Sequence, residues 1–353
     1  MNKSKLAICI ICLCVLSLFV GIFSSLNSSK NNVKNEQKAN NTITSTLQKN
    51  KILLLKFNGV ISSADEKSYF STATSAQDLV EALDSALKDD STKGVLIKLN
   101  TPGGTVGMSQ NIYDAIIRVR KVKPVVISME DVSASGGYYI SAAADRIFAQ
   151  RGTMTGSIGV IFSTMDIHEL LTEKLLIKSN VIKSGKYKDV GSQLRPMSDE
   201  EKELLQGIID DSYNQFLNDI TKGRITPYIA NNQKDKNGFY NYTSVPSSKL
   251  STETLKKYAD GRVFTGSQAY ALGFVDGLGD LETAHEAIVK MAKERFHISD
   301  KNIPLVQYNK YQSFSEYILN SVNSISGKNL SSEIADYVPN SMKMAKQPLY
   351  LWE

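Results

Sequence analysis

The sequence predicts an α/β fold with a mostly parallel sheet and flanking helices, preceded by one N-terminal transmembrane helix. Its first clear feature is an uncharged apolar stretch from Leu6 to Leu26. After residue 50, short apolar segments alternate with segments whose apolar residues recur at helical spacing. Strands that alternate with helices are typical of right-handed βαβ units, in which the strands are parallel. The chain of 353 residues is long enough to bury a large core.

The apolar stretch is about 20 residues long, which is the length that a helix needs to cross a hydrocarbon core of about 30 Å. A cleaved signal peptide is the alternative, but its apolar region usually runs only about 7–15 residues. Lysines lie on both sides of the stretch, so they do not set its orientation. We predict that residues 1–28 form a membrane anchor. Residues 29–50 are rich in Asn, Ser, Lys and Thr and are expected to form a flexible tether.

The first strand is predicted at residues 51–57, where Lys51 and Lys56 are the only residues that are not apolar. Ser75 and Asp78 have the spacing of a capping box, so a helix is expected to begin there. The elements predicted next are a strand at 94–99, a helix at 107–120, a strand at 124–129, a helix from Ser135 to Ala144 and a strand at 145–149.

A second capping box, formed by Ser198 and Glu201, begins a long helix. This helix carries one wide apolar stripe: Leu204, Leu205, Ile208, Ile209, Tyr213, Phe216, Leu217 and Ile220. The stripe either packs on the core or contacts another copy of the chain. Residues 225–252 are polar and rich in Asn and Ser, which is typical of an insertion. We therefore expect a domain at 51–290, followed by a C-terminal extension at 291–353.

Composition argues against several classes of function. Lys and Arg total 41 against 36 Asp and Glu, and no basic run with interleaved aromatic residues suggests nucleic acid binding. The three cysteines, Cys9, Cys12 and Cys14, all lie in the apolar stretch, and the three histidines are scattered. We therefore expect neither a disulfide framework nor a metal site, and no cofactor.

Two glycine-rich segments could support catalysis. Pro102-Gly103-Gly104 directly follows a predicted strand, where glycines allow a sharp turn and leave amides free to face a ligand. An ordinary strand-to-helix turn is the alternative. Ser135 precedes Gly136 and Gly137 at the start of a predicted helix, an exposed position that suits a nucleophile. A helix-capping serine is the alternative there.

A third segment, Lys183 to Asp189, holds three lysines around Gly185. A lysine acts as a general base only when neutral, so its pKa must fall from about 10.4 toward about 7–8. A solvated loop is the alternative. A Ser-His-Asp triad that uses His168 is the competing catalytic arrangement.

Six segments in one order, between about Lys51 and Asp280, resemble the signal peptide peptidase SppA family. They are 100–104, 134–141, 144–148, 155–160, 184–189 and 259–266. The resemblance implies the crotonase/Clp protease-like α/β core. It also implies the site: Ser135 as nucleophile, Lys188 as general base, Ser157 in support of the lysine, and an oxyanion hole around Gly103, Gly104 and Gly136.

The resemblance further implies a membrane-bound, homo-oligomeric serine peptidase that needs no metal and cuts remnant signal peptides or other apolar peptides. The catalytic domain is then expected on the extracytoplasmic side of the cell membrane. Residues 225–252 make this chain longer than compact members, and its C-terminal extension is unmatched. Lys186 and Lys188 would share one face of an extended segment, and the family's Gly-x-x-Lys spacing selects Lys188. Two other functions stay open: a non-catalytic membrane scaffold and an acyl-CoA-processing enzyme of the same fold.

Overall fold

The computed structural model describes residues 49–63, 75–226 and 249–308. The chain divides into two compact units, Met1–Lys49 and Asn50–Glu353. The predicted anchor and tether lie almost wholly outside the described residues, as do most of the predicted insertion and of the C-terminal extension. Among the helices in the described ranges, none is long and apolar enough to span a membrane.

The second unit is built on an eight-stranded sheet in the order β6-β5-β3-β2-β1-β8, with β4 paired to β3 and β7. Its strands are β1 (Lys51–Asn58), β2 (Thr92–Thr101), β3 (Val125–Ala134), β4 (Arg146–Ala149), β5 (Met154–Gly156), β6 (Val263–Thr265), β7 (Gly277–Leu278) and β8 (Leu305–Gln307). Among the described pairings, all are parallel except that of β5 with β6. The predicted mostly parallel sheet is therefore confirmed.

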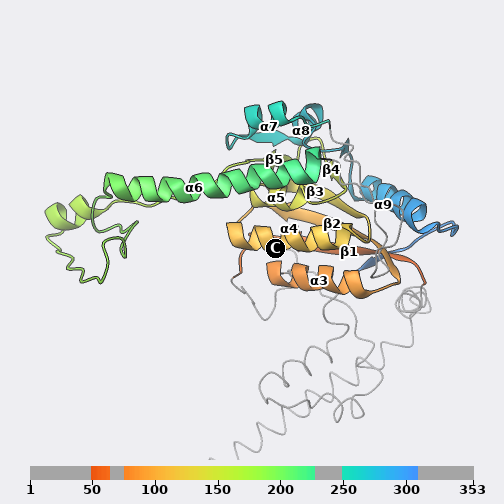
Figure 1. The fold of residues 1–353 in the computed structure, drawn as a ribbon, viewed down its shortest axis with the longest axis horizontal. Helices are drawn as coiled ribbons and strands as arrows, with labels where there is room; N and C mark the ends of the chain where they lie inside the picture. Colours follow the sequence, from red (N-terminus) through yellow and green to blue (C-terminus); the bar gives the residue numbers. More distant parts are fainter. Residues whose placement is uncertain (1–48, 64–74, 227–248, 309–353) are drawn as a thin grey trace, which may run out of the picture. The chain divides into compact units, whose positions relative to one another are not determined.

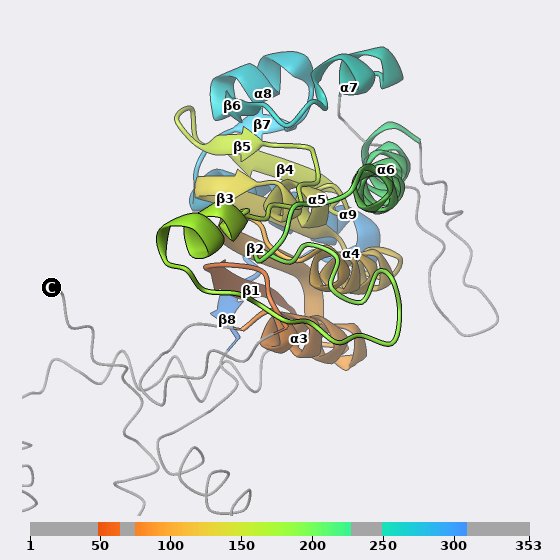
Figure 2. The ribbon, with the colours of Figure 1, turned by 90° about the vertical axis from the view of Figure 1, so that its left-hand side faces the viewer.

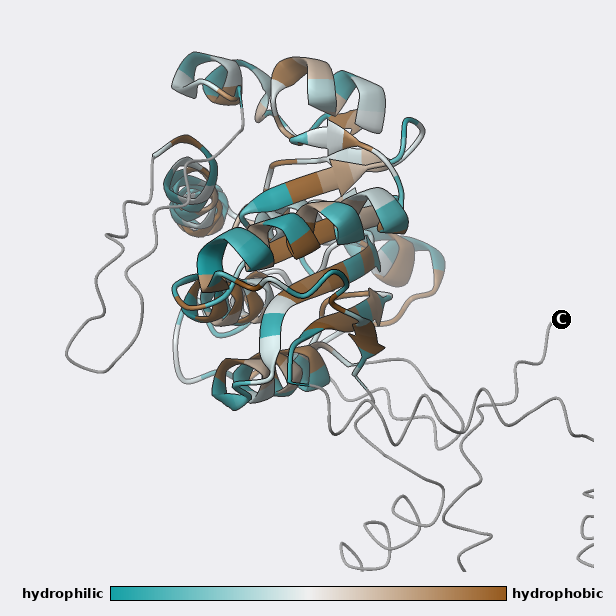
Figure 3. Cartoon of the chain, turned by 90° about the vertical axis from the view of Figure 1, so that its right-hand side faces the viewer, coloured by the Kyte–Doolittle hydropathy of each residue, from teal (hydrophilic) through white to brown (hydrophobic). Residues whose placement is uncertain are grey.

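Helices cover both faces of this sheet (Figures 1 and 2). They are α3 (Ala76–Lys88), α4 (Val106–Arg120), α5 (Gly136–Ser141), α6 (Asp199–Ile220), α7 (Thr252–Tyr258), α8 (Gly266–Leu272) and α9 (Leu281–Phe296). Two π-helical turns, η1 (Leu170–Lys174) and η2 (Thr221–Ile225), flank α6 in the sequence. The main core lies between the sheet and α3, α4 and α5, and a smaller core lies under α9. Figure 3 shows the hydrophobic strands beneath α9 and the hydrophilic outer side of that helix.

The predicted ends of one strand and one helix differ most from the structure. The strand expected to end at Met129 continues to Ala134, because Val132, Ser133 and Ala134 pair with the distant strand β5. The helix expected to reach Ala144 ends at Ser141.

The apolar stripe of α6 is only partly used inside the chain. Among its residues Phe216 and Ile220 are buried near the C-terminal end, whereas Leu204 is 39% and Ile208 57% exposed. The interpretation of the stripe as core packing therefore holds for the last two turns of the helix alone.

Candidate active site

Ser135 lies where β3 ends and α5 begins. Its backbone has φ 53° and ψ −118°, a conformation that is uncommon for residues other than glycine. Its amide donates to the Gly156 carbonyl at 2.8 Å, and its carbonyl accepts from the Tyr139 amide at 2.9 Å. Ser135 occupies the N-cap position of α5, but its hydroxyl makes no capping hydrogen bond to that helix. Strained backbone of this kind costs about 1–3 kcal/mol and clusters at functional sites.

The glycine loop between β2 and α4 touches this junction directly. Gly103 has φ 102°, and a Cβ atom built on it would lie 2.7 Å from the Gly136 nitrogen and 2.9 Å from the Ser135 Cβ. A Cβ atom on Gly104 would lie 1.9 Å from the Ile61 carbonyl oxygen. Only glycine therefore allows the loop to approach both Ser135 and the segment at Ile61.

Two of the loop's contacts show why it is fixed in place. The Ile61 amide donates to the Gly103 carbonyl at 2.9 Å, and the Ile61 carbonyl accepts from the Thr105 amide at 2.8 Å. These bonds form an isolated parallel bridge between Ile61 and Gly104. The glycine loop is thus held by the segment at Ile61 on one side and lies against Ser135 on the other.

Two backbone amides are available beside Ser135. The Gly103 amide donates to the Thr101 hydroxyl at 3.1 Å and is already engaged. The amides of Gly104 and Gly136, by contrast, have no acceptor within the described part of the chain. They are close to each other, because a Cβ atom on Gly136 would lie 3.2 Å from the Gly104 nitrogen. Two neighbouring amides without an acceptor can stabilise an oxyanion when both point at it.

Ser157 lies next to Ser135 across the sheet. Ala134 pairs with Gly156 in the β3–β5 register, so the residues that follow them are neighbours. Ser157 also has positive φ, 50°, and its amide donates to the Arg262 carbonyl at 2.8 Å. The two serines are therefore neighbours at the ends of β3 and β5, and both have positive φ.

The turn at residues 183–192 holds three lysines with different surroundings. Lys183 pairs with Asp189, and Lys186 pairs with Glu200. The Glu200 carboxylate raises the pKa of Lys186 and so favours its charged form. Lys188 is exposed, and within the described ranges its ammonium has no carboxylate partner.

The structure does not bring Lys188 and Ser135 together within one chain. The turn is joined to the first residues of α6 through Arg195, and the 22 residues of α6 make a helix about 33 Å long. The opposite end of α6 packs on α5, where the Phe216 and Tyr139 ring centroids are 4.8 Å apart. Figure 1 shows α6 extending well past the helices beside it. Lys188 therefore lies near the end of α6 that is far from the core and from Ser135.

His168 is placed no better for the competing triad. It lies half-buried on the same projecting segment, and its Nδ1 lies 2.9 Å from the Leu194 carbonyl oxygen. Among the described residues, no group of three or more His, Cys, Asp or Glu side chains could hold a metal ion.

Two features of this region were not predicted from the sequence. One is the cluster of Asp189, Arg195 and Glu201, for which the capping-box position of Glu201 was the only signal. The other is a set of apolar side chains at least half exposed on the segment before the turn: Ile161, Phe162, Met165, Leu170, Leu175, Leu176, Ile177, Val181 and Ile182. We call this set the apolar segment.

Gly104→Ala tests the amide pair. The methyl group would lie 1.9 Å from the Ile61 carbonyl oxygen, so the backbone must shift and the amide with it. We expect kcat of the reaction catalysed at this site to fall about 10²–10³-fold, the effect of losing one oxyanion donor. Gly107→Ala is the matched control, because nothing lies within 4 Å of its new Cβ atom. Equal rates in the two variants, with both folded by circular dichroism, would contradict the assignment.

Comparison with known proteins gives consistent results. Residues 117–243 match the model of peptidase family S49. The chain is 36% identical over 247 residues to "Putative protease slr0021" of Synechocystis sp., a match that covers 70% of this chain and 76% of that protein. It is 34% identical over 254 residues to "Putative signal peptide peptidase SppA" of Enterococcus faecium, covering 71% and 67% of the two chains.

A longer relative and a solved structure also match. The chloroplastic serine protease SPPA of Arabidopsis thaliana is 30% identical over 288 residues, which cover 80% of this chain but 38% of that protein. A mutant of the 1510-N membrane-bound stomatin-specific protease aligns with 74% of this chain and 98% of its own, at 14% identity and a TM-score of 0.42.

Proposed function

The chain belongs to peptidase family S49 and is a serine peptidase, and we propose that Ser135 is its nucleophile and Lys188 its general base. The observation that carries the proposal is the pair of unpaired amides, Gly104 and Gly136, beside a strained serine whose hydroxyl does not cap its helix. These are the groups that acyl transfer needs at one place: an exposed hydroxyl and donors for the oxyanion.

In the proposed reaction, Ser135 Oγ attacks a peptide carbonyl while neutral Lys188 accepts its proton. The Gly104 and Gly136 amides donate to the oxyanion that forms. Protonated Lys188 then gives its proton to the leaving amine, and water hydrolyses the acyl-enzyme by the same steps. Ser157 lies next to the nucleophile, where its hydroxyl can accept a hydrogen bond from the Lys188 amine and orient it.

Because Ser135 and Lys188 lie apart in one chain, we propose a homo-oligomer in which Lys188 of one copy reaches Ser135 of a neighbouring copy. The apolar segment supports this arrangement, since isolated exposed apolar residues are ordinary but a long run of them on one projecting segment is typical of a contact surface. Leu204 and Ile208 on α6 are exposed as well. The assembly would bury both and would move Lys188 out of water.

We further propose that residues 1–28 anchor the chain in the cell membrane, with the crotonase/Clp-like catalytic domain on the extracytoplasmic side. The uncharged stretch from Leu6 to Leu26 supports the anchor. The anchor would concentrate the enzyme where cleaved signal peptides and other apolar peptides accumulate. Two relatives named as signal peptide peptidase or SPPA are consistent with that class of substrate.

A membrane-impermeant fluorophosphonate, added to intact or lysed protoplasts that express the full chain, tests nucleophile and topology together. We expect labelling in both preparations, with the adduct on the peptide that contains Ser135. Labelling only after lysis would reverse the topology and leave the nucleophile in place. Absence of labelling in both, from a folded protein, would favour the non-catalytic scaffold.

A further inference from the structure

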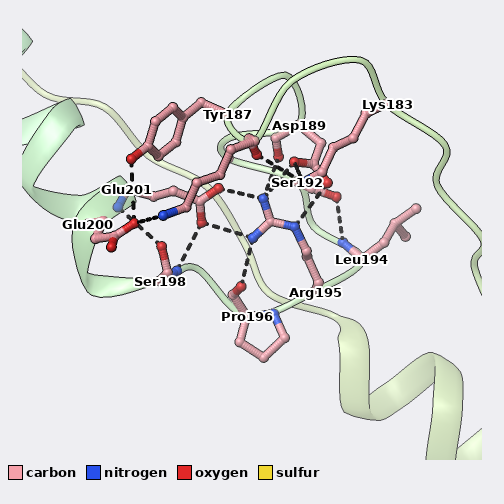
Figure 4. A network of polar contacts seen from close by, with 12 residues as sticks. Lys183, Tyr187, Asp189, Ser192, Leu194, Arg195, Pro196, Ser198, Glu200 and Glu201 are labelled. Atoms are coloured by element: carbon pink, nitrogen blue, oxygen red, sulfur yellow. Dashed lines mark hydrogen bonds and ion pairs between the residues drawn. The ribbon is translucent and has the colours of Figure 1, made fainter.

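Three charged side chains connect the Lys188 turn to the beginning of α6 (Figure 4). Arg195 donates to both carboxylate oxygens of Asp189, at 3.0 Å from Nε and 2.7 Å from Nη2. The same guanidinium donates to both oxygens of Glu201, at 2.8 Å from Nη1 and 2.5 Å from Nη2. We call Asp189, Arg195 and Glu201 the clamp.

The clamp is more enclosed than the other ion pairs at this end of α6. The side chain of Glu201 is 4% exposed and that of Asp189 13%, whereas Lys186 and Glu200 are 63% and 61% exposed. Exposed pairs are screened by water and contribute little, whereas planar two-point contacts of Arg with carboxylates fix geometry. The clamp, rather than the Lys186–Glu200 pair, therefore sets the position of the turn.

The clamp ends on a fixed point of the helix. Glu201 accepts from the Ser198 amide at 2.9 Å, and the Glu201 amide donates to the Ser198 hydroxyl at 3.2 Å. At the other end of α6, Tyr113 donates to the Asp219 carbonyl at 2.9 Å from within the core. Any movement of the Lys188 turn relative to the core must therefore break the clamp or move α6 itself.

The clamp also neutralises the carboxylate next to the proposed base. Asp189 follows Lys188 in the sequence, and a free carboxylate there would favour the charged ammonium of the lysine. Hydrogen bonds from Arg195, and then from Lys183, lower the pKa of Asp189. The Arg195 contact likewise lowers the pKa of Glu201 to about 2. Both carboxylates thus stay charged and paired with Arg195 at neutral pH, and the Glu201 contact is lost only as the pH falls from about 4.3 toward 2.

We propose that Arg195 is a positioning residue of the peptidase site. It holds the Lys188 turn on the start of α6, and its positive charge offsets the charge of the Asp189 carboxylate next to Lys188. The inference rests on the proposed role of Lys188 as base. Arg195 is assigned no contact with substrate. Loss of Arg195 is therefore expected to change the rate of the chemical step and the pH dependence of that rate.

Arg195→Ala in the full chain tests this role. We expect kcat for an apolar peptide to fall about 10–100-fold, as for small displacements of a reacting group, with KM within twofold of wild type. The acidic limb of the pH–rate profile should move to higher pH, because Asp189 loses both contacts with Arg195 and keeps only its ion pair with Lys183. Adding Asp189→Asn should return the limb toward its wild-type position without restoring kcat, which separates charge from position.

Arg118→Ala is the matched control, since Arg118 forms a 2.9 Å ion pair with Asp84 between α3 and α4, far from the turn in sequence and half exposed. It should leave kcat and the pH profile unchanged. Glu201→Gln is the second variant: it leaves Arg195 on Asp189 but weakens the tie to α6. It should lower kcat without moving the acidic limb, and it decides the question if Arg195→Ala fails to fold.

Wild-type kcat and an unmoved acidic limb in Arg195→Ala would overturn the inference. If Arg195→Ala does not fold, wild-type kcat in Glu201→Gln would overturn it. Lys188→Met distinguishes this failure from failure of the proposed function. If Lys188→Met is inactive while Arg195→Ala is normal, only the positioning role is wrong; if Lys188→Met is active, the base itself is wrong.

Discussion

Replacing Ser135 by alanine should lower kcat for peptide hydrolysis by about 10⁴–10⁶-fold, as loss of the nucleophile does in other serine peptidases. The free energy of unfolding should change by no more than about 0.5 kcal/mol. The hydroxyl makes no capping bond to α5, and alanine meets the same backbone strain as serine. Steady-state hydrolysis of an apolar peptide and urea unfolding of the same preparation measure the two effects.

Ser75→Ala supplies the opposite result as a control. Its hydroxyl accepts from the Asp78 amide at 3.1 Å and caps α3, so its loss should cost about 0.5–2 kcal/mol of stability and no activity. If Ser135→Ala retained near-normal kcat, or lost activity only through unfolding, Ser135 would be a structural serine.

Features of the fold that depend on local sequence could be predicted. The capping boxes at Ser75 and Ser198 are both formed as their spacing predicted, because each uses residues only three apart. The strand past Met129 was missed, since its partners, residues 154–156, are far away in the sequence. The exposure of Leu204 and Ile208 was equally hidden, because an apolar stripe looks the same whether it faces a core or another copy.

In the candidate site, too, some features could be predicted from the sequence and others depend on contacts that the sequence does not reveal. The glycines at 103, 104 and 136 could be identified from their places next to predicted strand and helix ends, but the contacts that require Gly103 and Gly104, with Ser135 and Ile61, come from distant parts of the sequence. Which amide is available could not be identified, since it depends on the Thr101 hydroxyl that engages Gly103. The role of Arg195 was also hidden, because charged residues that alternate along a polar turn give no sign of which pairs are enclosed.

Lys188→Met should lower kcat as severely as the loss of Ser135, whereas Lys186→Met should keep most of the wild-type rate. Lys186 is held in an exposed ion pair with Glu200, which raises its pKa and makes it a poor base. Within the described turn, Lys188 alone among the three lysines has no carboxylate partner. Hydrolysis rates of the two variants, with thermal unfolding as a check on folding, decide between them. Activity in Lys188→Met together with inactivity in Lys186→Met would contradict the assignment.

Mixing Ser135→Ala with Lys188→Met tests whether the two residues act between copies. Each variant alone is expected to be inactive, but each retains the residue that the other lacks. If Lys188 of one copy serves Ser135 of the next, random mixed assemblies contain complete sites, and an equal mixture should recover about a quarter of the wild-type rate after subunit exchange. If both residues of a site come from the same copy, no complete site can form. Mass spectrometry verifies that the subunits have exchanged. If the exchanged mixture stays inactive, Ser135 and Lys188 of one chain belong to the same site. The projecting turn would then have to fold back onto its own core.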